Sequence, residues 1–254
     1  PTAISVQCSE GSASVWVGVE NDDVFYRIDA DEFDGLAEGT AIDPTATASG
    51  DPVSLGCTGE CTLGSVLSQD GKFLYVLGRT KVMKIDTISL TKTKEFTISS
   101  GQMITKDNRG NIWVTDGDNN TIYRIDSAEN LSTLNVNLPT AGITVIPPGE
   151  PLSAEILAFT NKATGALCKA EITGNDTAAP TLGTITCADA PPENARGSGI
   201  SYDPVTKDIW LTLKDAAKVY KYSFSSNYLS AQAYDSNTLQ GTLDSYADFV
   251  GTTY

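Results

Sequence analysis

Histidine is absent from the 254 residues, and this absence excludes more chemistry than any other feature of the composition. Without histidine the chain has no Ser-His-Asp or Cys-His nucleophile system and none of the imidazole ligands that usually hold zinc or copper. Positive charge is also scarce, because 17 Lys and Arg stand against 32 Asp and Glu, for a formal net charge of −15. No basic cluster is present to grip a phosphate backbone, so we expect no nucleic-acid partner.

Long apolar runs are missing as well. No run approaches the roughly 18–20 residues that a helix needs to span a bilayer, and the negative charge repels anionic membrane surfaces. We therefore expect no membrane insertion. The first fifteen residues lack the basic and then apolar order of a signal peptide, which predicts a mature end from which any such peptide has been removed.

The sequence does contain a repeated phrase. Its clearest copy is GNIWVTDGDNNTIYRID at 110–126, where two β-rich runs flank an Asp/Gly/Asn turn, as in an antiparallel hairpin. Weaker copies occur at 14–29, 73–86, 155–172 and 208–223. A small-residue apolar strand precedes each hairpin and a Thr-rich strand follows several of them, which makes four strands per unit. Four-stranded antiparallel units repeated around an axis are the blades of a β-propeller.

The basic residue of the third strand gives the number of blades. It recurs five times, and the residues left over to close the circle are too few for a sixth blade. The five positions are Arg27, Lys84, Arg124, Lys169 and Lys221. We predict an all-β fold, a single propeller of five four-stranded antiparallel blades. The blades are expected at about 2–56, 57–99, 100–139, 140–190 and 195–240, with 241–254 as a closing strand or an arm.

The phrase at 110–126 resembles the NHL, YVTN and gluconolactonase-like group of propellers, whose units share Gly-x-Ile/Leu-Trp/Tyr-Val-x-Asp, a turn and Ile-x-Arg-Ile-Asp. The resemblance covers all five hairpins and implies architecture only, since members of this group serve as enzymes, binders and scaffolds. The catalytic histidine of the streptogramin-lyase type has no counterpart here. No Glu, Asn and Asp set for the metal of gluconolactonase-like members stands out, and the expected channel strands carry no acids for glycosidase chemistry. We therefore predict no catalytic residues and no enzyme.

Five cysteines indicate disulfides. Cys168 and Cys187 fall in neighbouring antiparallel strands, and a bridge between them would contribute roughly 3 kcal/mol in the chain-entropy model. Cys57 and Cys61 bracket a tight loop and form the second expected pair, worth roughly 2 kcal/mol. Metal ligation by this second pair is the alternative, although no other cysteine pair or histidine supports it. Cys8 is left over, either as a buried thiol or as a residue that pairs between molecules.

Three N-x-Ser/Thr sequons lie in predicted turns, where a glycan can be accommodated. They begin at Asn119, Asn130 and Asn175. Together with the cysteines they predict a glycoprotein that is secreted or exposed at the cell surface.

Two patterns suggest bound ions. The five recurring basic residues could form a ring for an anionic ligand, but an acid follows two residues later in four cases, so repeated ion pairs between blades are the interpretation we favour. The turn at 116–120 resembles the start of a calcium loop. Thr121 and Ser127 stand where that loop needs Gly and Glu, which favours a solvated turn. We expect no cofactor, with calcium as the one open possibility.

These observations predict a non-catalytic structural or interaction module, such as a subunit of an extracellular assembly or filament. Its partners would be other protein subunits, among them copies of itself. Two alternatives stay open: a carbohydrate- or calcium-dependent binding module, and a metal-dependent lactonase or hydrolase of the gluconolactonase-like type. The candidate contact residues are Cys8, Tyr246, Phe249 and Tyr254.

Overall fold

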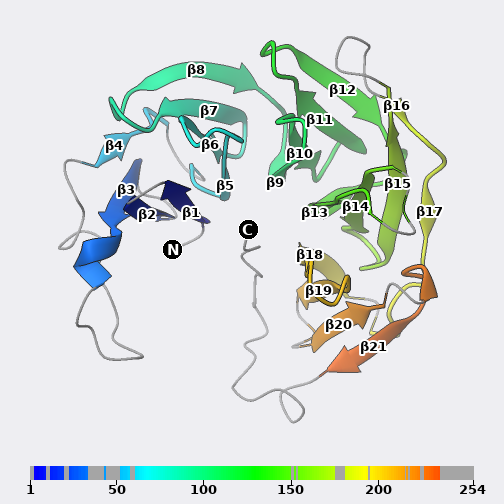
Figure 1. Cartoon of the computed structure of the whole chain (residues 1–254). Coiled ribbons are helices and arrows are strands. Elements are labelled where there is room, and N and C mark those ends of the chain that lie inside the picture. Colours follow the sequence, from blue (N-terminus) through cyan, green and yellow to red (C-terminus); the bar gives the residue numbers. More distant parts are fainter. Residues whose placement is uncertain are drawn as a thin grey trace. The chain divides into compact units, whose positions relative to one another are not determined.

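The fold is an all-β propeller with five antiparallel sheets as its blades, which confirms the predicted class (Figure 1). The computed structural model describes residues 3–9, 12–19, 23–33, 43, 52–57, 61–149, 152, 154–174, 181–193, 195–214, 216, 218–223 and 226–234. These residues form two compact units that divide after Gly101.

The first unit contains two blades, each built from consecutive strands. The first blade has β1 (Ala3–Ser9), β2 (Ser12–Gly18), β3 (Val24–Asp29) and β4 (Val53–Ser54), with a short 3-10 helix η1 (Ala30–Phe33) after β3. The second has β5 (Gly64–Leu67), β6 (Phe73–Leu77), β7 (Lys81–Asp86) and β8 (Lys92–Thr97).

The second unit contains three blades. The third blade of the chain has β9 (Gly101–Lys106), β10 (Ile112–Asp116), β11 (Thr121–Ile125) and β12 (Leu131–Asn135). The fourth has β13 (Thr140–Ile146), β14 (Ile156–Asn161), β15 (Leu167–Thr173), β16 (Thr181–Leu182) and β17 (Thr186–Cys187). The fifth has β18 (Arg196–Tyr202), β19 (Ile209–Lys214), β20 (Lys218–Tyr222) and β21 (Ala231–Tyr234).

The fourth blade differs from the expected four strands. Its outer position is divided between β16 and β17, which pair with different parts of β15. Residues 183–185 belong to neither strand, although the Gly183 N–H donates to the Glu171 carbonyl at 2.8 Å, so each outer piece is only two residues long.

Burial explains why the middle strands of a blade are mostly apolar. All five residues of β10 are buried, including Thr115 and Asp116, so both faces of this strand are covered. A strand covered on both faces reads as a continuous apolar run rather than as an alternation. The outer strand β12 alternates between exposed and half-buried residues.

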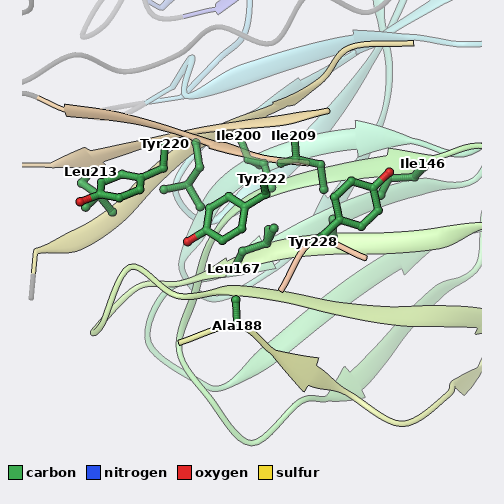
Figure 2. Packing of buried hydrophobic residues seen from close by; sticks show 11 residues of the cluster. Ile146, Leu167, Ala188, Ile200, Ile209, Leu213, Tyr220, Tyr222 and Tyr228 are labelled. Carbon is green, nitrogen blue, oxygen red and sulfur yellow. The ribbon is translucent and has the colours of Figure 1, made fainter. Parts of the chain in front are cut away.

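The core of the fourth and fifth blades is rich in tyrosine. Tyr220, Tyr222 and Tyr228 pack among aliphatic side chains such as Ile146 and Leu167 (Figure 2). Burial raises the pKa of Tyr222 to about 12, because a phenolate is poorly solvated there. These phenols therefore act as neutral core residues at physiological pH.

A close backbone contact joins the first strands of these two blades. A Cβ atom at Gly142 of β13 would lie 2.3 Å from the carbonyl oxygen of Ser198 in β18. The hydroxyl of Thr160 accepts the Gly142 N–H at 2.8 Å beside this contact. Only glycine fits here, which accounts for the small residues that precede the hairpin in the repeat.

Candidate functional site

Both predicted disulfides are present. Cys168 and Cys187 face each other in register across β15 and β17, with 4.0 Å between their Cα atoms. Cys57 and Cys61 close the short loop after β4. Cys8 lies in β1 in register with Ala13, and its side chain is outside the part that the structure describes.

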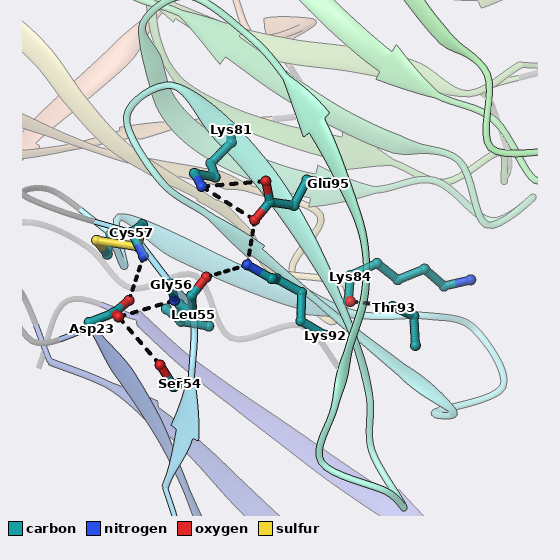
Figure 3. A network of polar contacts seen from close by, with 11 residues as sticks. Asp23, Ser54, Leu55, Gly56, Cys57, Lys81, Lys84, Lys92, Thr93 and Glu95 are labelled. Atoms are coloured by element: carbon teal, nitrogen blue, oxygen red, sulfur yellow. Dashed lines mark hydrogen bonds and ion pairs between the residues drawn. A yellow bond between two sulfur atoms is a disulfide. The ribbon is translucent and has the colours of Figure 1, made fainter.

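Asp23 lies beside the Cys57–Cys61 bridge, a neighbour that no sequence pattern predicts. Its carboxylate and the two sulfurs lie within 4.8 Å of one another, a grouping that could hold a metal. The sulfurs are bonded to each other, however, and only a thiolate is an effective ligand. The carboxylate instead accepts the N–H groups of Cys57 at 2.8 Å and Gly56 at 3.1 Å (Figure 3). Asp23 therefore anchors the disulfide loop to the turn that precedes β3.

The recurring basic residues lie against aromatic rings. Such a ring lies within 6 Å of four of them: Lys84 on Phe73, Arg124 on Trp113, Lys169 on Tyr228 and Lys221 on Trp210. Each of these four cations thus covers apolar surface, and this contact was missed by the sequence analysis.

The expected ion pairs with the following acids occur in part. Arg27 pairs with Asp29 on its own strand at 3.2 Å. Asp86 and Asp126 instead accept backbone N–H groups from the turns that follow them, Asp86 from Ser89 and Asp126 from Asn130. The pairs between blades that we favoured are replaced in these two cases by turn caps within a blade.

The calcium-like turn at 116–120 is organised by its own donors. The buried carboxylate of Asp116 accepts the N–H groups of Asp118 at 2.9 Å and Asn119 at 3.0 Å, and the Tyr123 hydroxyl at 3.0 Å. These bonds use the carboxylate lone pairs that a calcium ion would need. The geometry therefore favours the solvated turn.

The sequons are placed in part. Asn119 and Asn130 are both exposed. Asn175 lies outside the described residues, as do the candidate contacts Tyr246, Phe249 and Tyr254. Glycosylation and these contacts remain predictions.

The outer strands of the blades carry the remaining candidate site. Among the described residues, each outer strand has one edge that pairs with no other strand. Such edges invite pairing with another chain, and proteins usually protect them by shortness, charge or irregularity. β4, β16 and β17 have two residues each, and β21 has four. Length thus leaves β8 and β12 as the edges to compare.

The edge of β8 is protected by charge. It carries Lys92, Lys94 and Glu95 and has a register shift opposite the Lys84–Ile85 step of β7. Glu95 pairs with Lys92 and, at 3.3 Å, with Lys81 (Figure 3). The hydrogen bond from Lys92 and the charge of Lys81 lower the pKa of Glu95, so it is ionised at neutral pH. A strand approaching β8 must displace these charges.

The edge of β12 has no such protection. Residues 130–138, NLSTLNVNL, contain no ionisable side chain. Val136 donates its N–H to Asn120 at 2.9 Å, and Asp126 donates to Asn130 at 3.1 Å, so the even-numbered residues bond to β11. Bonded and unbonded positions alternate along an antiparallel ladder. The odd-numbered residues therefore direct their N–H and C=O groups away from the sheet; they are Leu131, Thr133 and Asn135.

A groove of about 650 Å³ adjoins β12 on the side of the fourth blade. Leu134, Val136 and Leu138 line it from the third blade, and Leu182 and Ile185 from the fourth. This lining is uncharged, and its apolar side chains alternate with the polar residues Asn135, Asn137 and Thr181. An extended segment could therefore bond to the edge of β12 while apolar side chains enter the groove.

A buried polar network holds the third blade rigid beneath β12. Asp107 accepts the indole N–H of Trp113 at 2.9 Å and the side-chain amide of Asn111 at 2.7 Å. Arg124 donates to the amide oxygen of Asn111 at 2.8 Å. These buried hydrogen bonds favour one packing arrangement, although Arg124 Nε has no hydrogen-bond partner in the described part of the chain, so β12 lies on a preorganised sheet.

The comparisons with known proteins agree with the fold. A family model described as Domain of unknown function (DUF5074) matches residues 3–246. No curated protein matches the sequence. In the described part of the chain, no helix has the length and apolarity needed to cross a membrane.

Solved structures resemble the chain along most of its length. A virginiamycin B lyase from Staphylococcus aureus is 18% identical with a TM-score of 0.68, and the match covers 92% of this chain and 69% of the lyase chain. A streptogramin B lyase is 15% identical with a TM-score of 0.65, and the match covers 91% of this chain and 68% of the lyase chain. A catalytically inactive histidine-to-alanine variant of the Staphylococcus aureus lyase with quinupristin is 19% identical with a TM-score of 0.55. This match covers 92% of this chain and 84% of the variant's chain. At such identities the likeness shows the fold, and it confirms the resemblance to the NHL and YVTN-like propellers.

These structures overturn the prediction that the protein is not an enzyme, because the propellers it resembles are lyases. The error lay in concluding too much from two absences, that of histidine and that of acids in the expected channel strands. The lack of histidine excludes histidine chemistry, whereas lysine, tyrosine and carboxylate side chains also serve as acids and bases.

Proposed function

The chain belongs to the DUF5074 family, and from this premise we propose that it is an extracellular protein-interaction propeller that docks its partner on the edge of β12. The observation that carries the proposal is the unprotected edge itself. Three successive outward-facing positions, Leu131, Thr133 and Asn135, pair with no other strand among the described residues, and they lie beside an uncharged groove.

Strand addition explains why both features are needed. Backbone hydrogen bonds to an edge supply affinity for any extended segment, and the pockets beside the edge select its side chains. The groove lined by Leu134 and Leu182 accepts apolar groups and offers no charge. The partner segment is therefore an extended, largely uncharged peptide with apolar side chains toward the groove.

The extracellular location rests on the two disulfides, which persist in oxidising compartments. The exposed sequons at Asn119 and Asn130 are consistent with it. Asn130 directly precedes β12, so a glycan there would lie beside the docking edge and restrict access to it.

A peptide selection tests the proposal. A random 12-residue library would be selected on the immobilised protein, and the affinities of the selected peptides would be measured by fluorescence anisotropy. Thr133→Lys places a charge at the centre of the edge, and we expect it to weaken binding at least tenfold. The matched control is Thr97→Lys, at an exposed outward-facing position of β8, which should leave binding unchanged.

Two outcomes would overturn the proposal. One is that no peptide is selected with measurable affinity. The other is that both lysine variants weaken binding equally, because the peptides would then respond to net charge rather than to the β12 edge.

A further inference from the structure

We infer that the segment which docks on β12 is β12 of a second copy of this chain, paired antiparallel about a two-fold axis at Thr133. This inference rests on the proposed function and uses one part of it, the pairing of an extended strand with the edge of β12.

The alternation of hydrogen bonds and the length of β12 together select the register. In an antiparallel pair, residues that exchange both hydrogen bonds must face each other, and they recur at every second position. The outward-facing residues of β12 are Leu131, Thr133 and Asn135. A centre at Thr133 places Thr133 opposite Thr133 of the second copy and Leu131 opposite Asn135 on either side, so all three outward-facing residues pair within the strand. A centre at Ser132 or Leu134 would pair only two of them within the strand, because the third would face Glu129 or Asn137 beyond its ends.

The side chains suit this register. Threonine facing threonine is a favourable cross-strand pair. Leu131 is 38% exposed and would be covered in part by the Asn135 side chain of the other copy. The arrangement is isologous, since the same residues contribute from both sides, as a two-fold interface requires.

The distribution of charge favours β12 as the edge where two copies meet. Each chain carries a formal net charge of −15, so two copies repel each other unless they meet where no acids oppose. Residues 130–138 are neutral, and the nearest acid before them, Glu129, would face Asn137 in the proposed register. No acid therefore opposes an acid along the paired strands.

The same operation fails on β8. Ile98 donates to Thr80 at 2.9 Å, so Thr97 and Glu95 are the outward-facing positions there. A two-fold axis at Glu95 would place two glutamates opposite each other, and like charges directly opposite destabilise a strand pair. Of these two edges, β12 pairs with itself without bringing charged residues together, whereas self-pairing of β8 brings the charged residues Lys92, Lys94 and Glu95 of both copies into one interface.

The predicted dimer is small. A pair of short edges buries much less area than a stable protein interface, which places the dissociation constant on the order of micromolar or weaker. Added salt should strengthen the dimer, because it screens the repulsion between two acidic chains.

Sedimentation velocity between about 1 μM and 1 mM tests the inference on the whole chain. The wild-type protein should shift from monomer to dimer as its concentration rises. Thr133→Lys should remain monomeric, since it places two ammonium groups opposite each other at the axis. Thr97→Lys on β8 carries the same change in charge and should dimerise like the wild type. Unchanged circular dichroism and melting temperature would show that the variants fold.

A charge-pair rescue makes the test specific for the axis. Thr133→Lys and Thr133→Glu should each be monomeric alone and should form a mixed dimer when combined. A mixture no more associated than its components would overturn the inference, as would a wild-type protein that is monomeric throughout. If the wild type is monomeric while selected peptides still respond to Thr133→Lys, the self-pairing fails and the proposed function stands. If Thr133→Lys affects neither assay, both fail.

Discussion

β8 and β12 occupy the same place in their blades, as the fourth and outermost strand. They differ in whether charged side chains protect the free edge against pairing with another chain. β8 carries two lysines and a glutamate, tied to the chain around it by ion pairs. β12 has only neutral residues. Both strands fulfil the same role in the fold, so the difference does not arise from the needs of folding. Edge protection is thus a separate property of a strand, and its omission on β12 is the observation on which the proposed docking edge rests.

Proline substitutions test the assignment of the two faces of the β12 backbone, with the largest expected effect. Leu134→Pro removes an N–H that bonds to β11 and should lower the free energy of unfolding by about 3 kcal/mol or more. Thr133→Pro removes an N–H that points away from the sheet and should cost clearly less. Urea unfolding measures both, with Leu134→Ala to separate the loss of the leucine side chain. Equal losses at 133 and 134 would show that the ladder alternates differently.

The fourth blade extends the comparison to an outer strand held by a covalent bond. Replacing Cys168 and Cys187 by alanine should lower the free energy of unfolding by roughly 3 kcal/mol, as the chain-entropy model gives for a loop of this size. The Cys57–Cys61 bridge closes a shorter loop. Replacing both of its cysteines by alanine should therefore lower the free energy of unfolding by less, roughly 2 kcal/mol. Thermal melts of the two double variants would show which disulfide contributes more to stability. The reverse order would mean that the loop anchored by Asp23 contributes more than its length implies.

Removing the charges of β8 should make it behave like β12. The triple variant Lys92→Ser, Lys94→Thr and Glu95→Thr should associate at concentrations where the wild type does not, because a second neutral edge becomes available. The stability should change by only about 1 kcal/mol or less, since exposed ion pairs contribute little. Light scattering at several concentrations measures the association. If the variant scatters like the wild type, charge is not what protects β8.

Lowering the pH gives the smallest expected effect on stability. It acts on the turns that precede β8 and β12, through Asp86 and Asp126. Hydrogen bonds from the backbones of Ser89 and Ile88 lower the pKa of Asp86. Partial burial raises the pKa of Asp126, but the bonds from Asn130 outweigh it and lower the pKa below its ordinary value. A carboxyl whose pKa is lowered by folding stabilises the protein above its unfolded pKa, and this contribution is lost as the pH falls through the folded pKa.

The melting temperature should therefore fall slightly below about pH 4. The double variant Asp86→Asn and Asp126→Asn should show a weaker dependence over the same range, because amides do not titrate. A double variant with an unchanged pH profile would assign the acid sensitivity to other carboxylates.

Much of the fold follows from local sequence. The hairpin phrase at 110–126 specifies two neighbouring strands and their turn, and five copies of it specify five blades. The bridge between Cys168 and Cys187 followed from the order of two strands. Asp23 could not be foreseen, because it reaches the Cys57 backbone across a sequence separation of 34 residues.

The candidate site was only half visible in the sequence. The neutral run at 130–138 can be read directly, but its meaning depends on which strand is outermost and on which residues bond to β11. Those are facts of pairing rather than of composition. Trp210 gives a similar lesson, since it repeats the position of the buried Trp16 and Trp113 and yet is half-exposed beside Tyr234. A repeat predicts where a residue lies in its blade, while its burial depends on what its neighbours cover.

The divided outer strand of the fourth blade has a practical consequence for how the molecule tolerates damage. Cys168 precedes β16, and its bridge to Cys187 spans the residues between. A protease that cleaves at 183–185, between β16 and β17, would therefore leave two polypeptides that still travel as one molecule on a non-reducing gel. Reduction would release them as separate bands, so a cleaved preparation would pass for an intact one in any assay that omits a reducing agent.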